Sequence, residues 1–570
     1  MLICGINSGH NGSAALIRDG KILSALQEER ISRVKNFFGF PSLSIDRLLK
    51  MEGASFNDVD AFVFGGKETY LPFVVPDPDP KKAKIRAYKS IGGLSGQIRR
   101  IMRKTPLRTL IYRQRLQKRI EPLLTRGIPR EKIHLMEHHR CHATTAYYGQ
   151  EKRSDVLVMT LDGSGDGLCG TVSIPDEHGN LNRVSELIDC NSLGHLWAII
   201  TSHMGMVPLE HEYKMMGMAP YADKRRARKV ADLFNSGLSF KEGRWYRGAG
   251  VPETIYSYNH WRSLLEFVRF DDLCAGLQLF TEEVVTNWVK YWLKKTRLKA
   301  LLLSGGVFMN VKLNHVISDL DEVEQLFVFP SCGDETNAIG AAWAYLEDLG
   351  KGEQIEPIHS MYLGVPPNDK DYEDTKRLAI SKGYPLEEPA NLSHRIAELL
   401  AAGEIVARCE GREEFGARAL GNRSLLADPS RPESVGVLNR AIKNRDFWMP
   451  FACTVLDKEE ERYIDNPKGF SAPYMILAFN SRSSKEIAAG IHPQDLTIRP
   501  QVLKKTVNAE YYDILEHYSK ITGRGALLNT SFNLHGEPIV STPHDALDVF
   551  ERSGLKHLSL KNIIVHKQDK

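Results

Sequence analysis

A strand, a Gly-rich turn and a hairpin occur in that order twice along the chain, and this repeat constrains the fold more than any other feature. In the first copy an apolar run reaches a turn at residues 9–12, and Asp19-Gly20 then marks a hairpin between apolar runs. In the second copy an apolar run at residues 156–161 leads into Asp162-Gly-Ser-Gly-Asp-Gly167 and a further strand. Two copies of one unit predict an internal duplication.

Such a duplication is known from the class of actin, the sugar kinases and the heat-shock chaperone ATPases, in which paired Gly-rich turns face a nucleotide. Glycine lets backbone N–H groups approach a phosphate closely. Two further turns follow strand-like runs: Ser304-Gly305-Gly306 leads toward Asn310, and Asp334 stands near the start of an Ala-rich helix. One such turn can be a tight surface turn without a ligand, but four together favour phosphate or ribose binding beside a helix N-terminus.

Composition excludes several classes of protein. The chain has 570 residues, 42% of them hydrophobic, with a formal net charge of +4; this describes a globular protein of two to four domains. Eight cysteines without a C-x-x-C pair argue against a disulfide scaffold or zinc ribbon and for a reducing cytosol. We expect no signal peptide and no membrane span, because the apolar runs are too short for about 30 Å of hydrocarbon. The protein is therefore predicted to be cytoplasmic, with no membrane partner.

Residues 81–126 differ in kind from the rest of the chain. They are rich in Lys and Arg, contain Glu121 as their single acidic residue, and show helical spacing of apolar residues. The segment is interpreted as an inserted basic helical region. It is either a solvated helical face or a surface that attracts an anionic substrate or partner, and the sequence leaves both open.

A polar, Pro-containing stretch between residues 350 and 388 predicts a domain boundary. We expect an N-terminal domain at residues 1–355 and a linker plus a second α/β domain at residues 356–570.

Four side chains have the composition of a metal site. His138 and His142 are four residues apart, so they share one face of a helix. Asp162 and Asp334 each begin a turn after a strand, and Asp166 is a reserve ligand. Two imidazoles and two carboxylates suit Fe(II), Mn(II) or Zn(II). His10, inside the first Gly turn, is placed as a general base, since an ordinary histidine pKa of about 6.5 suits neutral pH.

The second domain contains a dense Arg/Gly segment at residues 410–424, followed by further basic residues. Guanidinium groups bind phosphate or carboxylate oxygens in a bidentate way, so this segment predicts an anion site rather than a solvated charged face. The basic residues concerned are Arg418, Arg423, Lys443, Arg445 and Arg499. Asn529 and Ser531 could add further polar contacts.

At these residues the sequence resembles the NodU/CmcH/TobZ family of O-carbamoyltransferases over nearly its whole length. The motifs that carry the resemblance are GHNGSAAL with the following EER, the HxxxH of His138 and His142, LDGSGDG, SLGHLW, EYKMMGMAPYA, LSGGVFMN, PSCGDE, GREEFGARALGNRSLLADP and NTSFNLHGEP. So many motifs in one order make the resemblance specific.

The resemblance implies a first domain similar to the tRNA threonylcarbamoyl-transferring ATPases of the actin-like class and a second domain similar to YrdC. The YrdC-like domain would bind ATP and carbamoyl phosphate through Arg418, Arg423, Lys443, Arg445 and Arg499, and would form carbamoyl-adenylate. The first domain would hold a metal at His138, His142, Asp162 and Asp334, with Fe(II) ahead of Mn(II), Mg(II) and Zn(II), and His10 as base. The expected nucleotide contacts are Gly163, Ser164, Gly165, Ser304, Gly305, Gly306, Asn310, Asn529 and Ser531.

The acceptor would be a hydroxyl-bearing small molecule, a specialised metabolite. Ala417, Thr336 and the segment before Arg499 depart from the family pattern, which affects the outline of the phosphate sites. Modification of tRNA is the main alternative; near-neutral charge weighs against nucleic acid and residues 81–126 weigh for it. An actin-like structural or chaperone ATPase would have no use for the Arg/Gly segment, and a hydrogenase-maturation carbamoyltransferase would carry C-x-x-C motifs. A homo-oligomer stays open.

Overall fold

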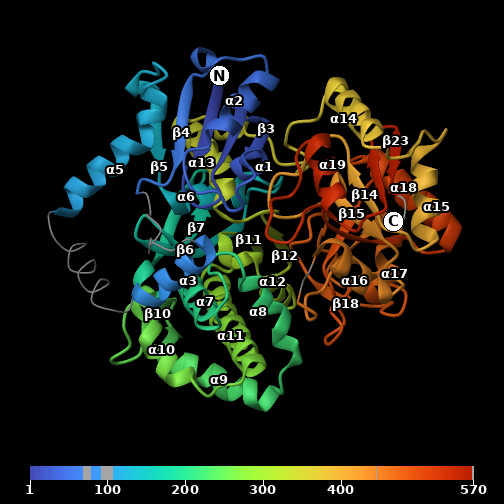
Figure 1. Cartoon of the computed structure of the whole chain (residues 1–570). Coiled ribbons are helices and arrows are strands. Elements are labelled where there is room, and N and C mark those ends of the chain that lie inside the picture. The colour runs from blue at the N-terminus through green and yellow to red at the C-terminus, as the bar shows by residue number, and fades with distance from the viewer. Residues whose placement is uncertain (69–78, 92–106, 444–445, 568–570) are drawn as a thin grey trace. The chain divides into compact units, whose positions relative to one another are not determined.

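A computed structural model of the chain describes residues 1–68, 79–91, 107–443 and 446–567 (Figure 1). The chain forms two compact units. The first comprises Met1–Lys21, Phe38–Ser42 and Ala54–Pro357, and the second comprises Ile22–Phe37, Leu43–Gly53 and Ile358–Lys570. The chain therefore enters the second unit early, returns, and enters it again after Pro357. The mixed α/β class is confirmed, since both units combine sheets with helices.

The first unit contains the same strand arrangement twice. In one sheet β2 (Ser13–Arg18), β1 (Leu2–Asn7), β4 (Ala61–Gly65) and β5 (Ile133–Met136) lie in that order, with β1 antiparallel to β2 and parallel to β4. In the other, β7 (Leu168–Pro175), β6 (Val156–Gly165), β11 (Ala300–Ser304) and β12 (Gln325–Val328) repeat this order and these directions. An antiparallel β8 (Leu181–Ile188) extends the second sheet. The repeated order agrees with the internal duplication that the repeated sequence pattern predicts.

Burial explains the apolar runs of these strands. Every residue of β1 and β11 is buried, as expected for strands covered on both faces. Helix α13 (Asn337–Asp348) packs against β1 and against α6 (His138–Tyr148). Two glycines permit this close packing: a Cβ at Gly5 would lie 1.8 Å from the carbonyl oxygen of Ala338, and one at Gly340 would lie 2.1 Å from that of Cys141. The N-terminal ends of α6 and α13 are thereby held close together.

The basic segment contributes α3 (Pro80–Ile91) and α5 (Leu107–Leu124). In α5 the side chain of Arg119 is 8% exposed, and its guanidinium lies 4.9 Å from the ring centroid of Phe64. In α3 Ala87 and Ile91 are buried, and the backbone carbonyl of Ile85 accepts a hydrogen bond from Ser202 Oγ in α7 (Leu193–His203). These buried side chains pack into the first unit, whereas residues 113–115, 117 and 118 of α5 are exposed, so both interpretations of the segment stay open. Residues 92–106 lie outside the described part of the chain.

The second unit is built on a mixed sheet between two helical layers. Its strand order is β13 (Leu386–Glu387), β23 (Ile563–His566), β22 (His557–Leu560), β14 (Val406–Cys409), β15 (Arg423–Ala427), β21 (Ala526–Ser531), β16 (Ala452–Leu456) and β20 (Pro500–Leu503). Val406 faces α15 (Leu392–Ala401) and α18 (Ala509–Thr522), whereas Ala407 faces α14 (Asp369–Ser381) and α19 (Pro543–Arg552). Successive strand side chains point to opposite faces, so helices cover both faces of the sheet at β14.

Segments from the first 53 residues complete the second unit. Strand β3 (Lys21–Gln27) leads into α1 (Glu28–Ser32), and α2 (Ser42–Met51) follows. The predicted N-terminal domain, residues 1–355, includes these segments, because no local pattern separates them from it.

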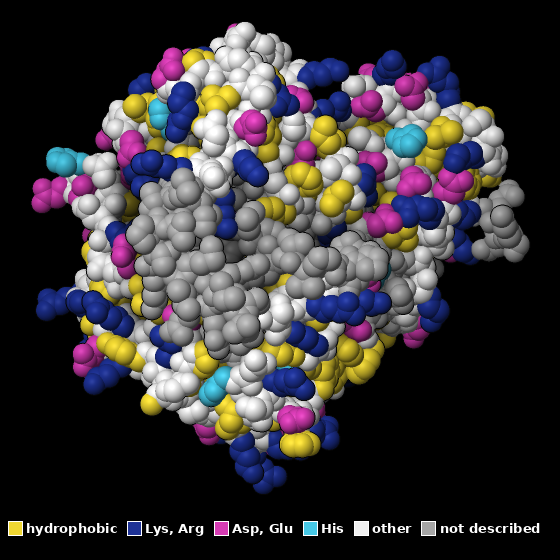
Figure 2. All heavy atoms as spheres, turned by 60° about the vertical axis from the view of Figure 1, so that its left-hand side comes forward, with side chains coloured by type: hydrophobic (Ala, Val, Ile, Leu, Met, Phe, Trp, Pro, Cys, Tyr) yellow, Lys and Arg dark blue, Asp and Glu magenta, His cyan; other side chains and the backbone are white. Residues whose placement is uncertain are grey.

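Surface charge is mixed, in keeping with the near-balanced composition. Lys and Arg side chains lie among Asp and Glu side chains over the described part of the face in Figure 2. Among the described residues, none of the helices combines the length and apolar composition needed to cross a membrane.

Candidate functional site

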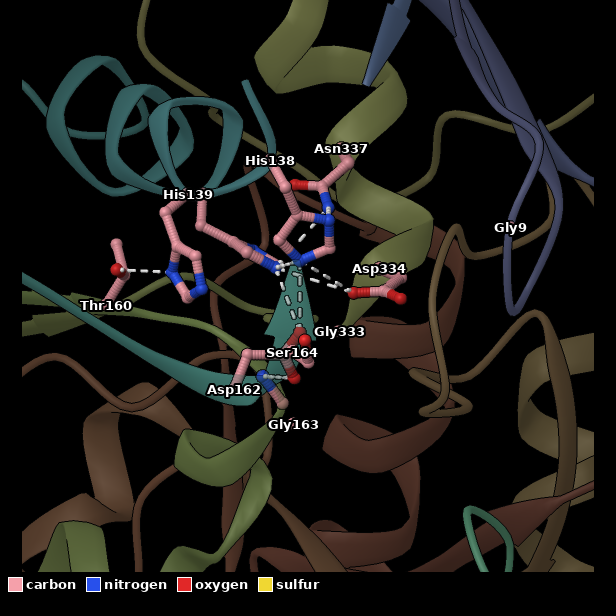
Figure 3. Close-up of polar contacts among 12 residues, drawn as sticks. Gly9, His138, His139, Thr160, Asp162, Gly163, Ser164, Gly333, Asp334 and Asn337 are labelled. Carbon is pink, nitrogen blue, oxygen red and sulfur yellow. Dashed lines mark hydrogen bonds and ion pairs between the residues drawn. The ribbon is translucent and has the colours of Figure 1, made fainter. Parts of the chain in front are cut away.

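Four potential metal ligands converge at one place in the first unit (Figure 3). His138 and His142 project from successive turns of α6, Asp162 lies in β6, and Asp334 begins the short turn before α13. One ligand atom from each lies within 4.8 Å of the others. The two Nε2 atoms are 3.2 Å apart, and His138 Nε2 is 3.1 Å from Asp162 Oδ2. The described residues contain no second group of this kind.

The cluster is held by residues around it. Glu137 caps α6 by accepting hydrogen bonds from two backbone N–H groups of its first turn. Asp166 accepts hydrogen bonds from the backbone N–H groups of His138, Lys67 and Glu68, at 2.7, 2.9 and 2.5 Å. Its carboxylate is therefore bound by the backbone, and Asp166, considered a reserve ligand, anchors the start of α6 instead.

Two neighbours of the cluster bear on the histidine tautomers. His142 Nδ1 lies 3.4 Å from Ser304 Oγ, which leaves Nε2 directed at the carboxylates. Asn337 places its side-chain amide 3.5 Å from His138 Nδ1, and this side chain is 1% exposed. Partners of this kind at the second ring nitrogen orient a ligating histidine. His139, between them in the helix, points away from the cluster to Thr160 Oγ1 at 2.9 Å.

Electrostatics in the cluster follow from two imidazoles facing two carboxylates. Burial opposes the charge on His138, but Asp334 and Asp162 outweigh it and raise the pKa of His138 to about 9. Burial likewise opposes the charge on His142, and hydrogen bonds to the same carboxylates raise its pKa. Burial favours the neutral form of Asp162, yet the two histidines hold its pKa well below the ordinary value. The site therefore stabilises positive charge between the carboxylates.

These residues fit a divalent metal ion. Asp334 Oδ1 is buried and lies 3.5 Å from both His138 Nε2 and His142 Nε2, so it offers an oxygen donor at the centre of the cluster. Two nitrogen and two oxygen donors are a set that Fe(II), Mn(II) and Zn(II) accept. The identity of the ion, and the ligand role of the four residues, stay predictions.

His10 lies in the first Gly turn, which the protein holds from two sides. Asn7 accepts from the Gly9 N–H at 3.2 Å and donates to the His10 carbonyl at 2.8 Å. Arg119 donates to Ser8 Oγ at 2.7 Å and to the carbonyls of Gly65 and Gly66 at the end of β4. The turn before His10 is therefore fixed to the neighbouring strand.

Burial and then the charge of Lys84 lower the pKa of His10 to about 4, against the opposing charges of Asp334, Asp162 and Glu210. The imidazole is accordingly neutral at pH 7, as a general base requires. Its Nε2 atom is buried and has no hydrogen-bond partner among the residues that the structure describes.

The residues expected to contact nucleotide have several local partners in the structure. Ser164 Oγ donates to Asp189 at 3.0 Å, and Gly306 N–H donates to Asp162 Oδ1 at 3.2 Å. Asn310 caps α12 (Val311–Ser318) by accepting from Leu313 N–H at 3.0 Å. Gly305 has a φ of +106°, and a Cβ there would lie 2.3 Å from the Leu161 carbonyl oxygen, so glycine is required at this close approach of β11 to β6. The turns thus border the metal-ligand cluster, and their nucleotide contacts stay predictions.

In the second unit the predicted anion-binding residues differ in their surroundings. Arg423 is fully buried in β15, and its guanidinium donates to the carbonyl oxygens of Ser541, Glu410, Asn422 and Gly411. Arg418 and Arg499 are half-buried. Arg445 lies outside the described residues.

Lys443 and Asn529 are also engaged within the second unit. Lys443 is 2% exposed, and its Nζ donates to Ser531 Oγ at 3.1 Å and to Asn533 Oδ1 at 2.9 Å. Asn529 donates to Thr454 Oγ1 at 3.1 Å. Two residues of the predicted anion site, Lys443 and Ser531, thus lie in contact. Arg423 is instead held by backbone carbonyls.

Three residues that hold parts of the candidate sites were not predicted from the sequence: Arg119, Asn337 and Glu414. Glu414 accepts the backbone N–H groups of Leu420 and Asn422, at 2.7 and 2.8 Å, and closes the loop that carries Arg418. The contact of Arg119 with Ser8 joins residues 111 positions apart, so no local pattern reveals it. Asn337 stands three residues after Asp334, a spacing that could have marked it as a neighbour of the cluster.

Comparison with known proteins gives the same assignment for both parts of the chain. The "Carbamoyltransferase N-terminus" family matches residues 2–343, and the "Carbamoyltransferase C-terminus" family matches residues 397–567. Nodulation protein NolNO of Sinorhizobium fredii is 29% identical over 98% of this chain and 79% of its own length. The 3'-hydroxymethylcephem-O-carbamoyltransferase of Amycolatopsis lactamdurans is 30% identical over 45% of this chain and 47% of its own length.

Among solved structures, the (R)-2-hydroxyglutaryl-CoA dehydratase component A of Acidaminococcus fermentans covers 61% of this chain at 12% identity, with a TM-score of 0.32, a value too low to assign a fold. The two family matches together span most of the sequence and include the metal-ligand cluster and the Arg/Gly segment. The chain therefore belongs to the carbamoyltransferase family and is a transferase enzyme of that family.

Proposed function

We propose that the protein is an ATP-dependent O-carbamoyltransferase that uses carbamoyl phosphate and transfers the carbamoyl group to a hydroxyl of a small specialised metabolite. Family membership supports carbamoyl transfer. The observation that carries the finer assignment is the convergence of His138, His142, Asp162 and Asp334 in the unit that also holds His10. A cation held between these carboxylates would offset the negative charge of an acyl-adenylate.

The second unit, expected to be YrdC-like, forms carbamoyl-adenylate. Loss of inorganic phosphate from carbamoyl phosphate to water leaves carbamate. A carbamate oxygen then attacks the α-phosphorus of ATP, and the bond to pyrophosphate breaks. Lys443, Arg418 and Arg499 bind the anionic substrate in this proposal, with Arg445 as a further candidate. Arg423 orders the loop through its four carbonyl contacts and does not bind the anion directly.

Transfer takes place in the first unit. The acceptor oxygen forms a bond to the carbamoyl carbon, the bond from that carbon to the phosphate oxygen breaks, and adenosine monophosphate leaves. The hydroxyl proton passes to Nε2 of His10, because the low pKa of this imidazole keeps it neutral and Nε2 has no hydrogen-bond partner in the described part of the chain. A bound divalent ion, with Fe(II) ahead of Mn(II), Mg(II) and Zn(II), would bind phosphate oxygens and offset their charge.

The proposal is tested by incubating folded, metal-loaded protein with ATP and carbamoyl phosphate but without an acceptor. We expect pyrophosphate release and carbamoyl-adenylate, detected by mass spectrometry, and neither product when carbamoyl phosphate is omitted. The Lys443→Met variant should lose both products while retaining its bound metal. Absence of pyrophosphate and adenylate with the wild-type protein would refute the mechanism.

A further inference from the structure

The EER motif that follows the first hairpin has no role in the proposed chemistry, although it is deeply buried. Gln27, at the end of β3, is 4% exposed, and Arg30, in α1, is 2% exposed. Both belong to the second unit. A guanidinium is costly to bury unless its N–H groups are satisfied. The position of Arg30 therefore calls for a specific partner.

That partner is the backbone of Gly416. Arg30 Nη2 donates a hydrogen bond to the Gly416 carbonyl oxygen at 2.6 Å, and the Gly416 N–H donates to Gln27 Oε1 at 3.1 Å. Arg30 Nη2 also lies 3.3 Å from Gln27 Oε1, so the two side chains hold each other. The backbone N–H and C=O groups of Gly416 are thus both bound by the side chains of Gln27 and Arg30. Gly416 has a φ of +111°, a conformation that L side chains rarely adopt.

The pair is itself anchored. Glu28 accepts hydrogen bonds from the backbone N–H groups of Leu43 and Ser44, at 3.0 and 2.7 Å, at the start of α2. Arg33 donates to the carbonyl oxygens of Ile539 and Pro538, at 2.6 and 3.0 Å. The segment that carries Gln27 and Arg30 is therefore fixed to α2 and to the loop after β21, and it cannot shift with Gly416.

The Arg418 loop is consequently held on both sides of Arg418. Gly416, two residues before Arg418, is bound by Gln27 and Arg30. Leu420 and Asn422, after Arg418, donate their backbone N–H groups to Glu414. We propose that Gln27 and Arg30 are positioning residues that fix the backbone before Arg418, so that its guanidinium is oriented for carbamoyl phosphate. This inference rests on the proposed function, in which Arg418 contacts that substrate.

The experiment follows pyrophosphate release in the absence of acceptor. It yields kcat, KM for carbamoyl phosphate and KM for ATP. Gln27→Leu removes the acceptor for Gly416 N–H while keeping the size of the side chain, and Arg30→Met removes the donor. We expect KM for carbamoyl phosphate to rise about tenfold in Gln27→Leu, the loss of one buried hydrogen bond, with KM for ATP nearly unchanged. Arg30→Lys should recover part of the loss seen in Arg30→Met.

Arg33→Met is the matched control, because it removes a guanidinium from the same segment that binds carbonyls away from the Arg418 loop. Its thermal unfolding temperature should fall without a change in KM for carbamoyl phosphate. In the double variant Gln27→Leu/Arg418→Met, KM should equal that of Arg418→Met alone, since a positioning residue acts through its target.

The outcomes separate the two proposals. If the wild-type protein releases no pyrophosphate, the proposed function fails. The proposed function stands if the wild-type protein releases pyrophosphate and Arg418→Met raises KM for carbamoyl phosphate. The positioning role is then refuted by either of two results: Gln27→Leu lowers only thermal stability, or Gln27→Leu raises KM as much in the Arg418→Met background as in the wild type.

Discussion

The metal-ligand cluster of the first unit and the Arg/Gly loop of the second use charged side chains in opposite ways. In the cluster, His138, His142, Asp162 and Asp334 face one another, and their donor atoms lie within 4.8 Å. In the Arg/Gly segment, the guanidinium of Arg423 donates to four backbone carbonyl oxygens. Charged residues that converge on each other indicate a site, whereas a charged residue surrounded by backbone carbonyls maintains the fold.

The difference arises from what each side chain can contact. Carboxylates and imidazoles that meet in a buried place shift each other's pKa and favour positive charge between them. A guanidinium has five N–H donors and can satisfy several backbone carbonyls at once. A dense run of arginines therefore mixes residues that bind substrate with residues that order the loop.

The largest expected effect comes from His10→Asn, which tests whether the two units divide the reaction. Asparagine cannot accept the hydroxyl proton, so transfer to an acceptor should fall by about 10²–10⁴-fold, the usual contribution of a general base. Pyrophosphate release without acceptor should continue at the wild-type rate. Loss of both activities in a folded variant would show that the units do not act separately.

The second prediction sharpens the claim that the cluster is a ligand set. His142→Ala should lower the affinity for Mn(II) or Fe(II) by more than about 100-fold, since losing a ligand exceeds the 10–100-fold effect typical of a residue behind a ligand. Asn337→Ala, which removes the amide beside His138, should fall within that smaller range. Metal content after dialysis and titration with Mn(II) measure both.

Thr160→Val provides the control for the second prediction, because it alters the contact to His139, which lies outside the cluster. Equal metal binding by wild type and His142→Ala would show that the four residues do not form a metal site.

The third prediction compares Arg423 and Arg418, two arginines of the Arg/Gly segment. Arg423→Met leaves buried carbonyl oxygens unpaired, so the free energy of unfolding should fall by about 3 kcal/mol. Arg418→Met, at a half-buried position, should cost about 1 kcal/mol or less and raise KM for carbamoyl phosphate instead. Chemical denaturation measures the first effect and pyrophosphate release the second. The reverse pattern would assign substrate binding to Arg423.

The smallest effect concerns pH. His10 accepts a proton only in its neutral form, and its pKa of about 4 keeps that form present at pH 7 and lost as pH falls through about 4. Lys84 lowers this pKa by repelling the imidazolium, so Lys84→Met should raise it and move the acid limb of the transfer rate to higher pH. Single-turnover transfer from carbamoyl-adenylate between pH 4.5 and 8 measures the shift.

Lys89→Met, in the same helix, is the control for the pH prediction, because Lys89 acts on His203 and is not among the charges that shift His10. If the acid limb of the transfer rate has the same midpoint in Lys84→Met as in the wild type, His10 is not the group whose titration limits transfer.

The sequence alone determined the features that depend on local pattern. The repeated strand and turn motifs predicted an internal duplication, because apolar runs and Gly turns are read directly from neighbouring residues, and one sheet arrangement does occur twice in the first unit. The spacing of His138 and His142, and the positions of Asp162 and Asp334 after strands, predicted which side chains would meet. The motifs in their order also indicated the family that the comparisons confirm.

Only the tertiary structure decided which polar groups serve the fold. It placed residues 22–37 and 43–53 in the second unit, bound Gly416 to Gln27 and Arg30, and bound Arg119 to the carbonyls of Gly65 and Gly66. Such contacts pair a side chain with backbone groups hundreds or tens of residues away, and backbone N–H and C=O groups are the same in every residue except proline. A sequence therefore shows where charged groups stand, while the folded chain decides which of them remain for a substrate.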